Sequence, residues 1–309
     1  MRRASLTFVT LLIDVIGFGI VIPVLPDLVE GMSGSREGGS RAYGWLIAAY
    51  GAMQFLFAPV LGKLSDRFGR RPVILLALLF TGLDYVLQAL APTVAWLFVG
   101  RIVAGIMGAS FTAANAYIAD ITPPEERAKN FGLVGAAFGA GFIVGPALGG
   151  ILGDLGPRVP FWAAAAATGI NLLYGLFVLP ESLAPENRRS FGPADVNPFR
   201  GLAILGRDAT VRALAIAAFL LYVAQVVPQA VWVLSNKVRF GWEEKENGYT
   251  LALLGACTMF VQLVLVRVLQ PRLGDSGLAR LGFVINAVGF VGLGLASRPE
   301  FLLVAMAVW

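Results

Sequence analysis

The chain has 309 residues, of which 57% are hydrophobic and 14% are charged, and its net charge is +5. Soluble domains carry about 25% charged residues, so the composition indicates a membrane protein. Membrane orientation explains the basic excess better than nucleic-acid binding does. A single cysteine, Cys257, excludes an internal disulfide. The lack of histidine removes the commonest metal ligand and the commonest general base, so we expect no metal site and no cofactor.

Apolar runs of about twenty residues follow one another along the chain, and a helix needs that length to cross a hydrocarbon core of about 30 Å. Only helices satisfy the backbone in lipid over such runs, so the sequence predicts an all-α integral membrane protein. The first run could pass for a signal peptide, but it is too long, contains Asp14 and lacks a small-residue cleavage site. The nine runs are about 4–26, 43–61, 73–91, 94–117, 131–153, 160–180, 211–234, 248–270 and 278–296, and a tenth begins at residue 299.

The densest charge cluster, GKLSDRFGRRP at 62–72, lies in the short link between the second and third runs. Placing the N-terminus inside puts 16 of the 24 Lys and Arg residues in inner segments and 7 in outer ones. Cytoplasmic loops carry the excess of Lys and Arg. We therefore expect a multi-pass protein with a cytoplasmic N-terminus and a cytoplasmic 62–72 link.

The longest polar stretch, residues 181–210, follows the sixth run. A shift of 205 residues superposes Pro23 on Pro228, and DRFG at 66–69 on PRLG at 271–274. Repeated halves of six helices are a known transporter architecture, with the binding site between the halves. At this shift the chain ends within the fourth span of the second half, so we expect a truncated second repeat and about nine and a half spans. The expected domains are an N-terminal six-helix half (1–182), a cytoplasmic linker (183–209) and an incomplete C-terminal half (210–309).

Three ionisable residues lie inside apolar runs, where such groups are costly and indicate function by default. Asp14 and Asp84 lie about half-way along the first and third runs, and Arg101 lies in the fourth. Helical spacing places each on a polar or small face, which predicts a shared aqueous cavity. The alternative is a buried Asp84–Arg101 ion pair that only fixes helix register. The three faces are Thr10, Asp14 and Gly17; Thr81, Asp84 and Gln88; and Arg101, Gly105, Gly108, Thr112 and Asn115.

The fifth run contains GAAFGAGFIVGPALGG at 135–150, with glycines four residues apart at 135 and 139 and again at 141, 145 and 149. That spacing favours close helix contact, and Pro146 should kink the helix. A dinucleotide-binding loop is excluded because the spacing is not GxGxxG and the stretch lies within an apolar run.

With these residues in hand, the sequence resembles the major facilitator superfamily. Within it the chain looks like the drug/proton antiporters, and most like the tetracycline efflux transporters. GKLSDRFGRRP (62–72), GRIVAGIMGAS (100–110) and GFIVGPALGG (141–150) match the loop, basic and antiporter motifs. LIDVIGFGIVIPVLP (12–26), MQFLFAPVLGK (53–63) and LDYVLQA (83–89) look like the tetracycline subgroup. The resemblance implies the major facilitator fold of two six-helix repeats in the plasma (inner) membrane.

The resemblance also implies roles for particular residues. A cytoplasmic gate motif would latch the two halves, and it comprises Gly62, Asp66, Arg67, Gly69, Arg70, Arg71 and Asp120. For Asp120, a charged residue in a solvated turn is an equally good interpretation. The antiporter helix motif would be Gly141, Gly145, Pro146 and Gly149. We expect the substrate and proton pathway to comprise Asp14, Gln54, Asp84, Arg101, Gln225, Gln229, Gln262 and Asn286. The sequence departs from the subgroup at Asn286 and Thr258, where the family has an acidic residue and a histidine.

These residues predict a proton-coupled antiporter that exports a small amphipathic drug, cationic or carried as a metal chelate. The proton gradient would supply the energy, since the sequence has no ATP-binding motif. The expected partners are the drug, protons and the bilayer, with no nucleic acid and a monomer favoured. The alternatives are an uptake symporter or facilitator, which the antiporter motif disfavours, and a non-functional fragment or sensor. An enzyme is disfavoured because Ser–His, Cys–His, zinc and P-loop patterns are lacking.

Overall fold

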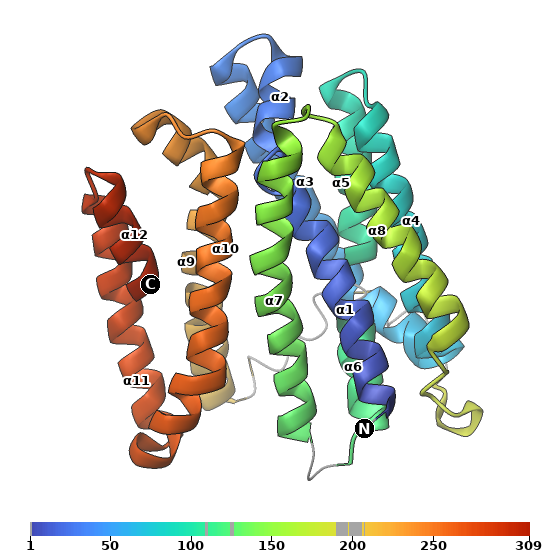
Figure 1. Cartoon of the computed structure of the whole chain (residues 1–309). Coiled ribbons are helices and arrows are strands. Elements are labelled where there is room, and N and C mark those ends of the chain that lie inside the picture. Colours follow the sequence, from blue (N-terminus) through green and yellow to red (C-terminus); the bar gives the residue numbers. More distant parts are fainter. Residues whose placement is uncertain (1, 109–110, 124–126, 190–196, 198–205, 207) are drawn as a thin grey trace.

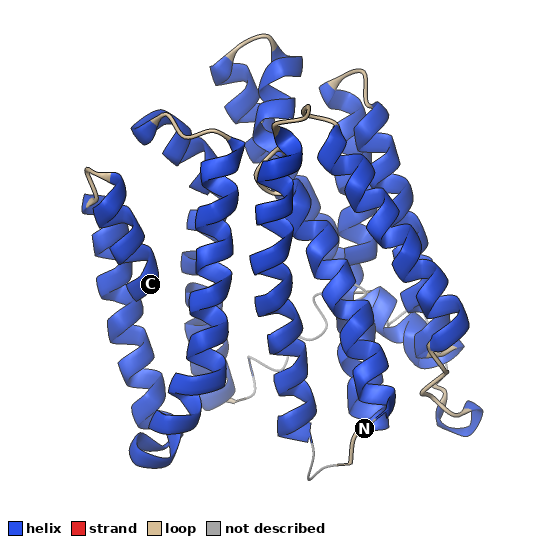
Figure 2. Ribbon diagram, in the orientation of Figure 1, coloured by secondary structure: helices blue, strands red, loops and turns tan. Residues whose placement is uncertain are grey.

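The computed structural model describes residues 2–108, 111–123, 127–189, 197, 206 and 208–309, and this part of the chain contains helices and no strands (Figures 1 and 2). The prediction of an all-α protein is confirmed. Nine helical segments among the described residues are long and apolar enough to cross a membrane. The first six helices are α1 (Arg2–Val21), α2 (Leu25–Ser33), α3 (Arg36–Phe68), α4 (Arg70–Leu90), α5 (Val94–Gly108) and α6 (Phe111–Ile121). The others are α7 (Arg127–Gly153), α8 (Val159–Val178), α9 (Ala209–Phe240), α10 (Glu244–Phe260), α11 (Val266–Leu295) and α12 (Pro299–Val308).

Local signals explain where several of these helices begin and end. Gly34 ends α2 in the left-handed conformation, and the Ser35 side chain then caps α3 by accepting a hydrogen bond from the Gly38 backbone. Gly241 ends α9 in the same left-handed way, and Glu243 and Glu246 form a capping box at the start of α10. These caps satisfy backbone groups that a helix end leaves without partners.

The link after the second apolar run is shorter than the sequence predicts. Helix α3 continues through the charged residues to Phe68, and α4 begins at Arg70, so Gly69 alone separates them. Gly69 has a φ of +105°, a conformation that side chains disfavour. A Cβ atom at Gly69 would also overlap the carboxylate of Glu181. The charged motif is therefore mainly helical and not a loop.

Helix α7 lies between α1 and α10 and contacts both along its length (Figure 1). The predicted close helix contacts are present. A Cβ atom at Gly145 would come within 2.8 Å of the Ile16 carbonyl oxygen on α1. On the other side, a Cβ atom at Gly150 would come within 2.7 Å of the Glu244 carbonyl oxygen on α10. Glycine on both sides of α7 thus lets two neighbouring backbones approach it.

A short π-helical segment, Val261–Leu265, joins α10 to α11. Such segments are rare and often mark functional sites. Gln262 lies on this segment, and a Cβ atom at Gly135 of α7 would overlap its side-chain oxygen. The contact between α7 and the π-helical segment therefore also depends on a glycine of α7.

Candidate functional site

A buried ion pair joins α4 to α5. Arg101 Nη2 lies 3.2 Å from Asp84 Oδ2, and both side chains are almost fully buried. Gln88 Nε2 donates a hydrogen bond of 2.6 Å to the same carboxylate oxygen. Gly100 lies so close to Asp84 that a Cβ atom there would overlap the carboxylate. Two donors and a glycine therefore hold Asp84 in place, as expected for a buried charge that is retained.

The pair faces a central cavity between α1, α3, α4, α5 and α7, with about 680 Å³ of space between the atoms, including its open mouth. Asp14 of α1 lines the same cavity, so the structure brings the three predicted intramembrane charges together. Among the described residues, no hydrogen bond or ion pair reaches the Asp14 carboxylate. The lining residues are Asp14, Val15, Phe18, Tyr50, Ala77, Leu78, Thr81, Asp84, Tyr85, Arg101, Ala104, Met107, Gly108 and Phe138.

Tyr50 of α3 forms one wall of the central cavity. The Arg101 guanidinium lies over its ring, 5.7 Å from the centroid, in a cation–π contact. The Tyr50 hydroxyl and the Gln54 amide both pack against Gly108 of α5. Gln54 therefore lies beside Tyr50 without lining the cavity itself. Tyr50 was missed by sequence reasoning, because single aromatic residues are common in apolar runs.

The predicted pathway residues of the second half whose side chains are described do not line the central cavity. Gln225 and Gln262 line a second-half cavity together with Cys257 and Thr258. The Thr258 hydroxyl donates to the Leu254 carbonyl oxygen at 2.9 Å. Asn286 is half-buried on α11 and lines neither the central cavity nor the second-half cavity. The side chain of Gln229 lies outside the described residues.

The predicted face of the fourth run is divided between two environments. Arg101 and Gly108 line the central cavity, whereas Gly105 packs so tightly that a Cβ atom would lie 2.5 Å from the Tyr50 carbonyl oxygen. Thr112 and Asn115 are exposed on α6 and are not among the residues that line the central cavity, so their expected place in a shared cavity stays a prediction. The helix is described as two pieces, α5 and α6, with residues 109–110 outside the described part.

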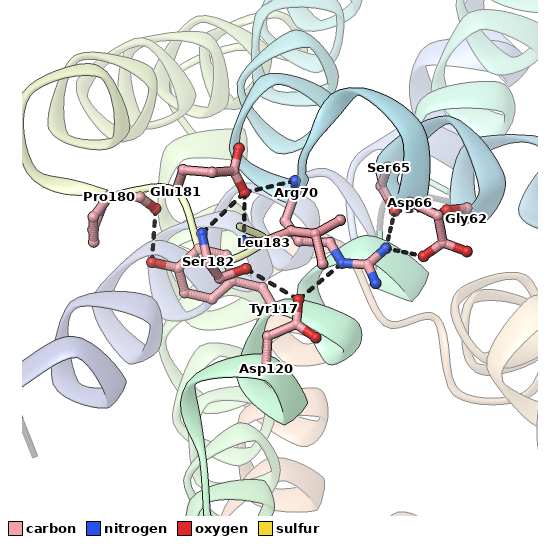
Figure 3. A network of polar contacts seen from close by, with 10 residues as sticks. All are labelled: Gly62, Ser65, Asp66, Arg70, Tyr117, Asp120, Pro180, Glu181, Ser182 and Leu183. Atoms are coloured by element: carbon pink, nitrogen blue, oxygen red, sulfur yellow. Dashed lines mark hydrogen bonds and ion pairs between the residues drawn. The ribbon is translucent and has the colours of Figure 1, made fainter. Parts of the chain in front are cut away.

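The charged motif forms a network at the end of the bundle where the N-terminus lies (Figure 3). Arg70 Nη1 bonds Asp66 Oδ1 at 2.5 Å, and Arg70 Nε bonds Asp120 Oδ2 at 3.1 Å. Arg70 Nη1 also donates to Ser65 Oγ, which in turn donates to the Gly62 carbonyl oxygen. The Arg70 side chain is 9% exposed, so this charge is buried among carboxylates.

Glu181 extends the network to the segment after α8 and was missed by sequence reasoning. Its Oε1 atom accepts from the backbone N–H groups of Arg70, Ser182 and Leu183 at 2.9–3.1 Å. Ser182 Oγ donates to Asp120, and Tyr117 donates to the Pro180 carbonyl oxygen (Figure 3). The acidic residue directly after the sixth apolar run was the only available signal. These contacts join α3, α4, α6 and residues 180–183.

The two remaining arginines of the motif make different contacts. Arg71 Nη2 donates to the Leu176 carbonyl oxygen of α8 at 2.6 Å. Arg67 is exposed and lies over the Phe68 ring, 5.2 Å from its centroid. Arg71 therefore adds a tie to the end of α8, while Arg67 stays at the periphery of the network.

At the opposite end of the bundle, ion pairs join the first part of the chain to the second. Lys237 of α9 bonds both Asp27 and Glu30 of α2. Lys245 of α10 lies 3.8 Å from Asp154, directly after α7. The Lys237 and Asp27 side chains are 25% and 15% exposed, so this contact is better shielded than the half-exposed Lys245 pair.

The sequence model of the Major Facilitator Superfamily matches residues 7–309. The chain belongs to the Major Facilitator Superfamily. The "Tetracycline resistance protein, class C" of Escherichia coli is 43% identical over 296 residues, which cover 94% of this chain and 72% of that relative. The class D protein of Salmonella ordonez is 37% identical over 294 residues, 94% of this chain and 73% of the relative.

Solved structures of the superfamily agree with the fold. The human organic anion transporter MFSD10 (TETRAN) superposes with a TM-score of 0.78 at 25% identity, covering 99% of this chain and 82% of that one. The prediction of a major facilitator fold is therefore confirmed, and the chain is a multi-pass membrane protein of a transporter family. This membership indicates a transporter and not an enzyme.

Proposed function

We propose that this member of the superfamily is a drug efflux transporter that exchanges a tetracycline-like, cationic or metal-chelated drug for protons. The chemical class of the substrate is supported by the names of the relatives, which are tetracycline resistance proteins. The proposed halves are residues 1–182 and 210–309, joined by residues 183–209. The N-terminal end of the bundle is the proposed cytoplasmic side of the inner membrane.

The proposed proton coupling rests on the difference between the two carboxylates of the central cavity. Two carboxylates line the central cavity, but only Asp84 has a cation partner and a second donor. A carboxylate that is buried without such partners costs free energy as long as it is charged. Asp14 can lower this cost by taking up a proton or by binding a cation. A drug cation and a proton therefore compete for Asp14, and this competition couples their opposed movements.

Asp84 has the complementary role. Arg101 and Gln88 both stabilise its charged form, so it stays ionised and contributes a fixed electrostatic field to the cavity. The Tyr50 ring beside Arg101 offers an aromatic surface for a ring-rich ligand. Gln225 and Gln262 supply hydrogen-bonding groups on the second half. In this proposal the drug binds in the central cavity and reaches towards the glutamines of the second half, while Asp14 of the first half carries the proton.

Alternating access requires contacts that break and reform at both ends of the bundle. The pairs of Lys237 with Asp27 and Glu30 join α9 to α2 at the proposed outer end. The Arg70 network fixes the relative positions of α3, α4, α6 and the segment after α8 at the proposed cytoplasmic end. We infer that the network keeps the first half rigid while the outer ion pairs open and close.

Transport in proteoliposomes tests this proposal, with tetracycline as the drug and a trapped pH dye. We expect Asp14→Asn to lose drug-driven proton movement and to bind the cationic drug more weakly, because both solutes use that carboxylate. Asp84→Asn should weaken both binding and exchange. Glu186→Gln, an exposed change outside both cavities, serves as the control. Membrane insertion should be equal for all variants, and undiminished proton movement in Asp14→Asn would contradict the proposal.

A further inference from the structure

Asp14 lines a second, smaller cavity in addition to the central one. This side cavity lies between α1, α4, α6 and the residue after α8. It is narrow, since its space of about 400 Å³ between the atoms includes the open solvent at its mouth. It extends from Asp14 along α1 towards the N-terminus. Its lining is Thr7, Thr10, Leu11, Asp14, Ile74, Leu78, Ala114 and Leu179.

The polar groups of the side cavity lie on one face of one helix. Thr7, Thr10 and Asp14 follow each other at steps of three and four residues along α1, so they are neighbours along that face. Thr7 and Thr10 are 3% and 5% exposed. Apart from them and Asp14, the lining is apolar. A hydroxyl, which can accept one hydrogen bond while donating another, therefore lies at every turn between Asp14 and the first turns of α1.

Helix α8 fixes this part of α1. Asn171 Nδ2 donates a hydrogen bond of 2.8 Å to the Thr10 carbonyl oxygen, and Asn171 is fully buried. The Thr10 backbone is thereby held against α8. The side cavity can thus keep its shape while the central cavity changes during transport.

The charged and titratable groups that face Asp14 all lie on its central-cavity side. They are Asp84 and Tyr85 of α4, Tyr50 of α3 and Arg101 of α5. The described lining of the side cavity contains no titratable group except Asp14. A proton that moves into the side cavity therefore avoids the guanidinium and the bound drug.

We infer that the side cavity is a proton route, separate from the drug route, that connects Asp14 to the N-terminal end of the bundle through Thr10 and Thr7. This inference rests on the proposed function. In the transfer, the O–H bond of the protonated Asp14 carboxyl breaks, its electron pair stays on the carboxylate, and the proton passes to water in the cavity. Each hydroxyl accepts one proton and gives up another, so it ends as it began.

This route explains how one carboxylate can serve two solutes. The drug occupies the central cavity and approaches Asp14 from there, while the proton leaves from the other side. Release of the proton to the cytoplasmic side therefore does not require the drug to move first. Thr10 and Thr7 relay the proton in this transfer and do not touch the drug.

Two transport modes separate the proton route from drug binding. Drug–drug exchange needs no net proton movement, whereas drug-driven proton release does. With tetracycline in proteoliposomes, we expect Thr10→Val to release protons about tenfold more slowly while exchanging drug at the wild-type rate. Thr10→Ser, which restores a hydroxyl, should release protons normally. Thr81→Val, the same kind of change in the central cavity, should affect both modes equally.

Ala114→Leu provides an independent test, because it fills the side cavity and leaves both threonines in place. We expect it to slow proton release selectively, as Thr10→Val does. Wild-type proton release in both Thr10→Val and Ala114→Leu would overturn the inference, and so would an equal loss of both modes in Thr10→Val. Failure of the proposed function gives a different result, namely drug transport by the unaltered protein without any proton movement.

Discussion

The ammonium group of Lys237 lies between the carboxylates of Asp27 and Glu30, although 210 residues separate Lys237 from Asp27 in the chain. This arrangement joins α9 to α2 across the two halves of the bundle. Two carboxylates around one partly buried cation give a stronger contact than a single exposed pair does. The contact therefore can hold one end of the bundle closed.

We expect transport to stop when this contact is made covalent. In a Cys257→Ser background, a bifunctional methanethiosulfonate reagent that spans the length of the replaced lysine side chain should join the pair Asp27→Cys and Lys237→Cys. Uptake of tetracycline into proteoliposomes should be lost on cross-linking and recover on reduction. The pair Glu37→Cys and Arg41→Cys is the control, because it replaces an exposed ion pair within α3. Full transport by the cross-linked Asp27–Lys237 variant would show that this end need not open.

Asp66→Ala should slow the transport cycle more than it weakens drug binding. The change removes one of the two carboxylates that hold the buried Arg70 guanidinium, while Asp120 and Ser65 remain. Loss of about 1 kcal/mol changes a population about fivefold, and we expect turnover to fall by at least about that factor. Binding affinity and turnover measured on the same preparation decide the matter.

The matched control is Arg67→Gln, since Arg67 is exposed and lies outside the network. It should leave both turnover and affinity close to their original values. A large loss of affinity in Asp66→Ala at unchanged turnover would place the motif in drug binding instead of in the conformational cycle.

Gly149→Ala should destabilise the protein. A Cβ atom at Gly149 would overlap the Ile20 carbonyl oxygen and lie 2.9 Å from Pro23 Cγ, so α1 and α7 would have to separate. Overpacking of this kind costs about 1–3 kcal/mol. Thermal unfolding in detergent measures the effect. Gly169→Ala in α8, where no atom lies within 4 Å of the added Cβ, should be neutral or slightly stabilising.

Asn286→Asp should not replace Asp14 as the proton carrier. Asn286 lines neither the central nor the side cavity, so a carboxylate there has no access to the proposed proton route. We expect the double variant Asp14→Asn with Asn286→Asp to remain without drug-driven proton release, and Asn286→Gln alone to behave like the original protein. Recovery of proton release in the double variant would assign the proton to the second half.

The intramembrane charges were predictable because an ionisable group in an apolar run is conspicuous. Asp14, Asp84 and Arg101 do meet at one cavity. The sequence left open whether Asp84 and Arg101 form a pair, and the structure shows that they do while also facing the cavity. Helical spacing placed Gln88 on the face of Asp84, and the hydrogen bond between them follows from that spacing.

Contacts between distant segments were not predictable in the same way. Glu181 and Lys237 are charged residues near the ends of apolar runs, where charge is ordinary, and their partners lie 111 and 210 residues away. Thr112 and Asn115 were expected in the cavity because their spacing continues that of Arg101. The structure instead exposes both side chains on α6, because helical spacing alone does not show which neighbouring helices cover a face.

Glycine on both sides of α7 has a mechanical consequence. The contacts with α1 and α10 bring backbone against backbone at Gly145 and Gly150, so no side chain of α7 separates the helices at these two points. Two smooth surfaces can slide or tilt past each other without any side chain changing its rotamer. The two halves can then move relative to each other along α7. The free-energy barrier to that movement comes from the ion pairs at the ends of the bundle.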